Sequence, residues 1–294
     1  MLASAHRTCF VRCALRSWLY LMNVDTYLRR IGLKSRPPAT LAGLTAIHRA
    51  HSLSVPYENL DVQFGRLVTI DRPAIYEKIV EKKRGGWCYE MNGVLGWALA
   101  ELGFNVTRAT GSVMREVSGA ASDGNHLVLR VELPEGLYLA DVGFGDGPRN
   151  PIRVVPGAFH ADGFDFSLRR VDEHWWRLNN DPRGGAPSFD FNLDPANEKL
   201  LAEKCDFLQT APASPFVQNL VVQRHVPHGL EILRGRTLRT IRADGISNTV
   251  IADEDELVKV LKKVFALDVP EAATLWPKIV ARHEEVLAQK AANA

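Results

Sequence analysis

The sequence has 294 residues, enough for one large domain or two to three ordinary ones, and its apolar fraction of 46% is typical of soluble globular proteins. A net charge of only +2 argues against a partner that is nucleic acid or an acidic membrane, and no apolar run is long enough for a transmembrane helix. Four cysteines without a CxxC pair are too few for a disulfide framework, which favours a reducing, cytoplasmic setting.

The first 21 residues differ in composition from the rest of the chain. They contain Arg7, Arg12 and Arg16 but no acidic residue, and these arginines interrupt the apolar stretch that a secretory signal would need. Such a segment is compatible with an organelle presequence, with translation from an upstream start codon, or with a disordered tail. We expect residues 1–21 to be a disordered N-terminal extension, because the helical pattern begins only at Met22.

Residues 22–104 are expected to form a helical domain. Apolar residues recur at helical spacing after Thr40, which is of a residue type that caps helices. Asp71 and the proline two residues later open a further helix, which Gly85 and Gly86 end. The next helix begins at Cys88.

From residue 105 the apolar period changes to two, which indicates short antiparallel strands. We expect a central antiparallel β-barrel over residues 105–195, a linking helix over 196–215 and a mixed α and β unit over 216–294. Helices come first, strands next and a mixture last. This order favours an α+β fold over a doubly wound parallel sheet.

Cys88 is the first candidate for chemistry, because it lies in RGGWCYEMN at the start of an expected helix. The unpaired N–H groups and the positive dipole end of a helix N-terminus favour a thiolate. A lone free cysteine is also commonly a small buried apolar residue. Position alone therefore supports a nucleophile and a core residue about equally.

His126 and Asp141 are the candidates that would complete a nucleophilic site. His126 begins an alternating strand in NHLVLRV, and Asp141 ends an apolar strand in LADVGFG. A carboxylate flanked by apolar residues needs a partner when it is buried. A histidine that bonds Asp141 with one ring nitrogen and faces Cys88 with the other would give a nucleophile, its base and a group that orients the base.

The three stretches RGGWCYEMN, NHLVLRV and LADVGFG resemble the motifs of the arylamine N-acetyltransferases, and their spacing agrees with that of bacterial members. VPYENLDV resembles a fourth family stretch, with Tyr57 where phenylalanine is usual. The resemblance covers residues 22 to 290. It implies a Cys88–His126–Asp141 triad in a cysteine-protease-like core made of a helical bundle and a barrel, closed by a C-terminal α/β lid.

The resemblance also implies a reaction and its substrates. An acetyl group would pass from acetyl-CoA, as a co-substrate, through an acetyl-cysteine to a small aromatic amine or hydrazine. Gly124, Asn125 and Phe216 are candidate contacts for CoA or the acceptor, no metal or tightly bound cofactor is expected, and a homo-oligomer stays open. The family pairs the residues that correspond to Glu58 and Arg84, which would hold the catalytic loop.

Other readings of the same residues remain. A polyketide-releasing amide synthase would use the same triad, a thiol hydrolase or transglutaminase-like enzyme also orders Cys, His and Asp, and a binding protein would carry the triad without using it. GFGDG at residues 143–147 begins like a dinucleotide-binding loop, but no helix follows it. His225 and His228 have no cysteine or carboxylate cluster beside them to support a metal site.

Overall fold

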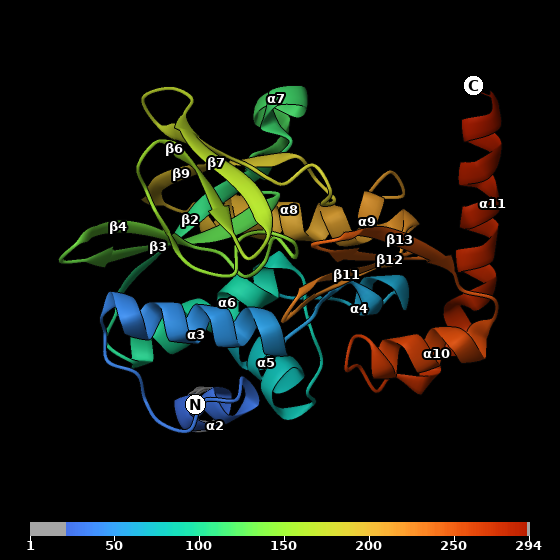
Figure 1. Cartoon of the computed structure of the whole chain (residues 1–294), viewed down its shortest axis with the longest axis horizontal. Helices are drawn as coiled ribbons and strands as arrows, with labels where there is room; N and C mark the ends of the chain where they lie inside the picture. The colour runs from blue at the N-terminus through green and yellow to red at the C-terminus, as the bar shows by residue number, and fades with distance from the viewer. Residues whose placement is uncertain (1–21, 293–294) are drawn as a thin grey trace, which may run out of the picture.

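The computed structural model describes residues 22–292. The predicted extension at residues 1–21, with Cys9 and Cys13, lies outside the described residues. The two ends of the described chain lie far apart in Figure 1, with α2 (Val24–Arg30) at the lower left and α11 (Trp276–Ala292) at the right. None of the helices in residues 22–292 combines the length and apolar character that crossing a membrane requires.

The segment before residue 105 is helical, as predicted. Thr40 caps α3 by accepting a hydrogen bond from Gly43 N–H, and Asp71 caps α5 through Ala74 N–H, so both predicted helix starts are confirmed. The helices that follow α2 are α3 (Leu41–Ser54), α4 (Leu60–Gln63), α5 (Arg72–Tyr76), the single π-helical turn η1 (Glu77–Glu81) and α6 (Cys88–Glu101).

The predicted antiparallel sheet is present and has eight strands in the order β5-β4-β3-β2-β9-β8-β7-β6. Every neighbouring pair is antiparallel, and the sheet curls into a half-barrel, where the sequence predicted an antiparallel β-barrel (Figure 1). Its strands are β2 (Asn105–Val113), β3 (His126–Leu133), β4 (Gly136–Ala140), β5 (Ile152–Arg153), β6 (Gly157–Ala161), β7 (Phe164–Arg170), β8 (Trp175–Asn179) and β9 (Ser188–Pro195). The short helices α7 (Arg115–Ser118) and η2 (Gly119–Ser122) connect β2 to β3.

The second sheet contains one strand from the N-terminal part of the chain. Its order is β1-β10-β11-β12-β13, and β1 (Tyr57–Glu58) pairs with β10 so that Tyr57 lies opposite Gln223. The remaining strands are β10 (Val221–Val226), β11 (Gly229–Arg234), β12 (Thr237–Arg242) and β13 (Gly245–Val250). The sheet therefore joins segments that the sequence assigned to separate units. The division into those units, and a core like that of cysteine proteases, stay predictions.

Helices complete the C-terminal half. The predicted linking helix corresponds to α8 (Glu198–Thr210), which α9 (Pro215–Gln218) follows. After β13 come α10 (Glu254–Lys263), the 3-10 helix η3 (Pro270–Leu275) and α11. Asp253 caps α10 through Glu256 N–H, and its acidic first turn and basic last turn complement the helix dipole.

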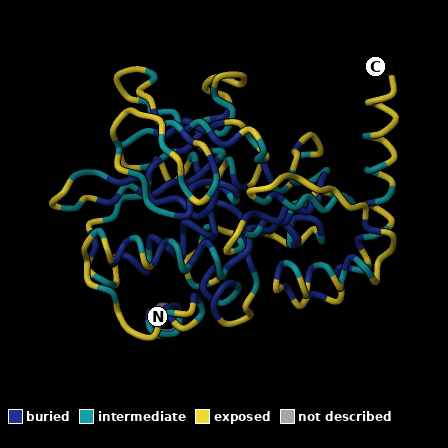
Figure 2. The backbone as a smooth tube through the Cα atoms, viewed as in Figure 1, coloured by how far each residue is buried: buried dark blue, intermediate teal, exposed yellow. Residues whose placement is uncertain are grey.

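Helix α6 lies in the core, with the N-terminal helices on one side and the curled sheet on the other (Figure 1). Figure 2 shows the buried residues concentrated there, and the first eight residues after Trp87 are all buried. A Cβ added at Gly96 would come within 2.9 Å of the Leu129 side chain on β3, so this glycine lets the helix approach the sheet. Helix α6 is thus packed closely against β3.

Candidate active site

Cys88 is the first residue of α6, and only 4% of its surface is exposed to solvent. Within residues 22–292, neither its backbone N–H nor that of Tyr89 donates a hydrogen bond to the protein. The glycines before it allow close approach: a Cβ at Gly85 would lie 2.1 Å from the Pro56 carbonyl oxygen, and one at Gly86 2.8 Å from Glu90. Packing at the helix start thus explains both glycines, and two free N–H groups point away from the helix beside the thiol.

His126 and Asp141 meet because their strands pair. Leu129 of β3 lies opposite Ala140 of β4, so His126 faces the segment that follows β4. His126 Nε2 lies 2.7 Å from Asp141 Oδ2. The Cys88 thiol donates to the Asn125 carbonyl oxygen at 3.9 Å and lies near enough to the His126 imidazole ring to raise its pKa. The structure therefore brings together all three residues that the sequence selected. Each is buried, with His126 2% and Asp141 8% exposed.

The electrostatics of this array favour an imidazolium. Burial by itself lowers the pKa of His126, but the charge and hydrogen bond of Asp141, together with the Cys88 thiol, raise this pKa to about 10. Burial by itself raises the pKa of Asp141, but His126, Asn92 and the Gly143 N–H outweigh it and lower this pKa. A cationic imidazole ring beside the sulfur stabilises a thiolate.

Asn92 is a residue of the site that the sequence analysis did not select. Its Nδ2 donates to Asp141 Oδ1 at 2.7 Å and to the Leu127 carbonyl oxygen at 2.6 Å, and its Oδ1 accepts from Val142 N–H at 2.9 Å. It is fully buried. The available signal was its position four residues after Cys88, which places both side chains on one helix face.

Aromatic rings enclose the imidazole. The ring centroids of Phe144 and Phe189 lie 5.9 Å and 5.0 Å from that of His126, and the two phenylalanine rings lie 4.8 Å apart. Their apolar surface excludes water from His126 and strengthens its interaction with Asp141. Such an array, a thiol at a helix N-terminus with a buried imidazole and carboxylate, is equipped for nucleophilic acyl transfer.

Comparison with known proteins agrees with this chemistry. A family model described as N-acetyltransferase matches residues 40–274. The arylamine N-acetyltransferase of Mycolicibacterium smegmatis is 35% identical, with 90% of this chain and 98% of that protein covered. Solved structures agree: that of arylamine N-acetyltransferase from M. smegmatis has a TM-score of 0.80 at 33% identity, covering 88% and 97% of the two chains. The structure of the Mycobacterium marinum enzyme in complex with CoA has a TM-score of 0.79 at 29% identity, covering 88% and 98%.

The chain belongs to the arylamine N-acetyltransferase family. It is an enzyme of the acyltransferase class. The family resemblance found in the sequence is thereby confirmed, and the three motifs lie in the part of the chain that the family model matches.

The other site residues that the family resemblance suggested have structural partners. The Gly124 carbonyl oxygen accepts from the Tyr89 hydroxyl at 2.7 Å, and the Asn125 side chain binds both backbone polar groups of Val113. The ring of Phe216 on α9 packs edge-on against Trp87, with centroids 5.4 Å apart. A direct contact of Gly124, Asn125 or Phe216 with CoA or the acceptor stays a prediction.

His225 and His228 do not form a ligand pair in this acyltransferase. His225 is buried with its Nδ1 3.3 Å from Arg149 Nε, whereas His228 is exposed in the β10–β11 turn. A cation beside the ring disfavours a second cation there. Across residues 22–292, no group of three or more histidine, cysteine, aspartate and glutamate side chains is arranged to hold a metal ion.

A buried chain of ion pairs supports the start of α6. Arg84 Nη2 lies 2.7 Å from Glu58 Oε1 and 3.4 Å from Asp61 Oδ1, so the pairing of Glu58 with Arg84 is confirmed. Lys78 Nζ continues the chain, 2.8 Å from Asp61 and 2.9 Å from Glu90.

Glu90 connects this chain of ion pairs to the start of the helix that carries Cys88. Its Oε2 accepts from Trp87 N–H at 3.2 Å, so the carboxylate caps the helix that Cys88 begins. Burial by itself lowers the pKa of Lys78, but Glu90, Glu58 and Asp61 raise it, which keeps the ammonium charged.

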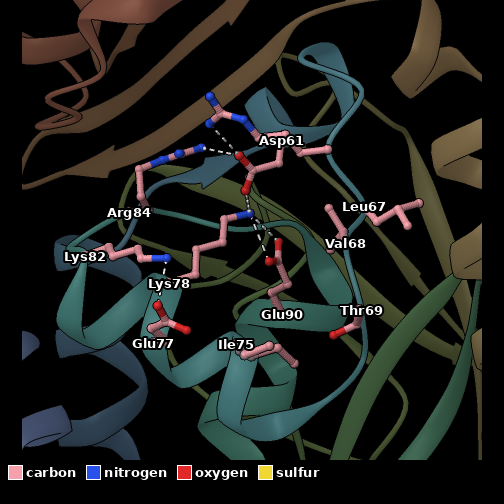
Figure 3. A pocket seen from close by; sticks show the side chains of 12 residues that line it. Asp61, Leu67, Val68, Thr69, Ile75, Glu77, Lys78, Lys82, Arg84 and Glu90 are labelled. Atoms are coloured by element: carbon pink, nitrogen blue, oxygen red, sulfur yellow. Dashed lines mark hydrogen bonds and ion pairs between the residues drawn. The ribbon is translucent and has the colours of Figure 1, made fainter.

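These ion pairs line a pocket of about 300 Å³ (Figure 3). Its charged walls pair among themselves, as the dashed lines in Figure 3 show for Asp61, Lys78, Arg84 and Glu90. Neither Cys88 nor His126 nor Asp141 lines it. We therefore assign its charged groups a supporting role, separate from the reacting groups.

Replacing Glu58 by Gln should destabilise the fold by about 3 kcal/mol, because it leaves Arg84 buried with only the more distant Asp61 as a counter-charge. Urea unfolding measures the change. The matched control is Glu77→Gln, which breaks an exposed pair with Lys82 in the same region and should cost no more than about 0.5 kcal/mol. Equal effects of the two changes would contradict a supporting role for the buried chain.

Replacing Gly143 by Ala should displace Cys88. The added Cβ would lie 2.7 Å from Cys88 Cα and 2.7 Å from Asn92 Nδ2, so we expect a loss of about 1–3 kcal/mol of stability and slower alkylation of Cys88 by iodoacetamide. Gly147→Ala is the control, since its Cβ would meet Phe144 at an ordinary 3.5 Å. An unchanged alkylation rate in the Gly143 variant would show that the segment after β4 moves to accommodate the new Cβ, and that helix α6 does not.

The raised pKa of His126 links stability to pH. An unfolded histidine titrates near about pH 6.5, so protonated His126 stabilises the fold fully below that pH and the stabilisation is lost as pH rises toward 10. The difference in unfolding free energy between the wild type and His126→Gln should therefore shrink between pH 7 and 10. The slope is at most about 1.4 kcal/mol per pH unit for one proton. A constant or growing difference in urea titrations would contradict the raised pKa.

Proposed function

We propose that this acyltransferase moves an acetyl group from acetyl-CoA to an arylamine or arylhydrazine by a ping-pong mechanism through a thioester on Cys88. The observation that carries the proposal is the buried array of Cys88, His126 and Asp141 at the start of α6, in which His126 Nε2 lies 2.7 Å from Asp141 Oδ2 and the Cys88 thiol raises the pKa of the same ring. Membership of the family implies acetyl transfer to such amines. The M. marinum relative solved in complex with CoA supports acetyl-CoA as the donor.

In the first half-reaction, the Cys88 thiolate attacks the carbonyl carbon of acetyl-CoA and forms a new carbon–sulfur bond. The tetrahedral adduct then releases CoA by breaking the original carbon–sulfur bond. The His126 imidazolium gives its proton to the departing CoA sulfur, which leaves acetyl-Cys88, free CoA and a neutral imidazole. Asp141 holds the ring through Nε2, so the nitrogen that exchanges protons is Nδ1.

The negative charge on the adduct's oxygen requires donors. The backbone N–H groups of Cys88 and Tyr89 donate to no protein acceptor in the described chain, and both lie at the positive end of α6. We assign them as oxyanion donors. Such preorganised donors commonly stabilise the transition state more than any other single group.

In the second half-reaction, the amine nitrogen attacks the acetyl carbonyl carbon of the thioester. Neutral His126 accepts the proton that the amine loses, the carbon–sulfur bond breaks, and the amide product leaves with Cys88 again a thiolate. The imidazolium beside Asp141 is restored, so the array returns to its starting charge state. Asp141 remains ionised throughout and stabilises the imidazolium in both halves.

Mixing the enzyme with acetyl-CoA alone should place one acetyl group on the peptide that contains Cys88, detected by mass spectrometry. Cys88→Ala should abolish it, and His126→Ala should nearly do so because the thiol then lacks its imidazolium partner. Asp141→Asn should slow turnover by about 10⁴-fold in a folded protein, since an amide cannot stabilise the imidazolium.

Cys205→Ala is the matched control for these variants. Burial raises the pKa of the Cys205 thiol, so it stays protonated, and acetylation should be unaffected. An acetyl group on Cys205, or on no cysteine while the enzyme turns over, would overturn the mechanism.

Adding an amine separates this function from the alternatives that share the triad. Release of CoA that depends on an arylamine or hydrazine supports the transferase, and equal release without amine indicates a thiol hydrolase. No reaction with acetyl-CoA indicates an amide synthase or a binding protein.

A further inference from the structure

His48 lies against the site, although the triad does not include it and the sequence analysis did not select it. It belongs to α3 and is 1% exposed. Its Nδ1 lies 2.8 Å from the Arg149 carbonyl oxygen, and its Nε2 lies 3.1 Å from the backbone nitrogen of Asp141. The ring thus bridges α3, the catalytic carboxylate's own backbone and the segment after β4.

The two partners fix the state of the ring. A carbonyl oxygen only accepts, so Nδ1 carries the hydrogen, and a backbone N–H only donates, so Nε2 offers its lone pair. His48 is therefore a neutral imidazole in a single tautomer. Burial lowers the pKa of His48, which agrees with this state.

Asp141 needs such a partner because its strand ends one residue earlier. Ala140 is the last residue of β4 and lies opposite Leu129, so the Asp141 N–H falls outside the ladder between these strands. A buried backbone N–H without a partner is costly. His48 supplies that partner from a different element.

The side chain of Asp141 is held separately. Oδ1 accepts from Asn92 Nδ2 at 2.7 Å and from Gly143 N–H at 2.8 Å, and Oδ2 bonds to His126. These bonds orient the carboxylate relative to the Asp141 Cα, whereas the bond that the Asp141 N–H donates to His48 Nε2 holds the backbone to which that side chain is attached. Both are needed to keep a carboxylate at a fixed distance from His126.

The other end of His48 is anchored firmly. Arg149, whose carbonyl accepts from Nδ1, is 2% exposed, and its guanidinium donates to the carbonyl oxygens of Pro227 at 3.2 Å and Gly229 at 2.7 Å. Pro227 lies in the β10–β11 turn, and Gly229 is the first residue of β11. His48 is thereby connected to the second sheet as well as to α3.

We propose that His48 is a positioning residue for acetyl transfer, which fixes the Asp141 backbone through Nε2 so that the carboxylate holds His126 in its reactive orientation. The proposal rests on the proposed transferase function. His48 reaches neither the thiol nor the imidazole through a hydrogen bond in residues 22–292, so it acts through Asp141.

Two substitutions separate the two bonds of the ring. His48→Gln places an acceptor oxygen at the position of Nε2 and keeps the bond to Asp141, while His48→Asn places an amide nitrogen at the position of Nδ1 and keeps the bond to Arg149. Each variant removes one buried hydrogen bond of similar type, so both should lose similar stability. Single-turnover acetylation of Cys88 by acetyl-CoA, its KM and the urea midpoint are measured for each.

We expect His48→Asn to slow Cys88 acetylation by about 10²-fold with an unchanged KM for acetyl-CoA, because the carboxylate shifts while the donor site does not. His48→Gln should acetylate at close to the wild-type rate. Equal slowing in both variants, slowing only in His48→Gln, or slowing in neither would overturn the proposal. Wild-type enzyme that forms no acetyl-Cys88 would instead overturn the proposed function.

A measurement on the wild type covers the case in which a variant does not fold. Nitrogen-15 spectra of the histidine rings at neutral pH should show one ring protonated on Nδ1, with a hydrogen bond that links its Nε2 to the Asp141 backbone amide. Protonation of His48 on Nε2 would leave no lone pair for that amide and would overturn the proposal.

Discussion

The hydrogen bonds of Asn92 are the interaction on which the site depends. One amide group on α6 bonds to the Leu127 carbonyl on β3, to the Asp141 carboxylate and to Val142 N–H, and so joins the three segments that carry Cys88, His126 and Asp141. Cys88 lies on the same face of the same helix, one turn earlier. One rigid helical turn therefore separates the Cys88 thiol from the amide that holds the Asp141 carboxylate. A buried amide with all its bonds made is costly to rearrange, which keeps the array in one geometry.

Burial strengthens the interaction between His126 and Asp141, but it also makes any unpaired charge in the same region unfavourable. His126 and Asp141 lie in a region walled by Phe144 and Phe189, where charge interactions are stronger than in water. The same low polarity would disfavour an unpaired charge. The charged side chains nearby are accordingly paired with one another, in the chain of ion pairs that runs from Glu58 to Glu90. Reactivity and folding stability are coupled here, because a substitution that leaves one buried charge without its partner lowers both.

The site lies where the helices and both sheets meet. Helix α6 supplies the thiol, the curled sheet supplies the imidazole, and β1 carries the segment before the catalytic loop into the second sheet. Tyr57 and Gln223, opposite each other in that pairing, connect residues far apart in the chain. Arg149 adds a further tie, from the segment after β4 to the β10–β11 turn. These two sets of contacts fix the position of the second sheet relative to Cys88, His126 and Asp141.

The sequence determined the features that depend on local pattern and on family motifs. The starts of α3, α5 and α6, the alternation of β3, the selection of Cys88, His126 and Asp141, and the pairing of Glu58 with Arg84 all followed from it. Only the tertiary structure decided that the sheet is an open half-barrel, that β1 joins the second sheet, that Gly143 packs against Cys88, and that Asn92 and His48 bond to Asp141. Helix caps and strand alternation are read from neighbouring residues, whereas these contacts join residues about fifty or more positions apart and exist only once the chain has brought its segments together.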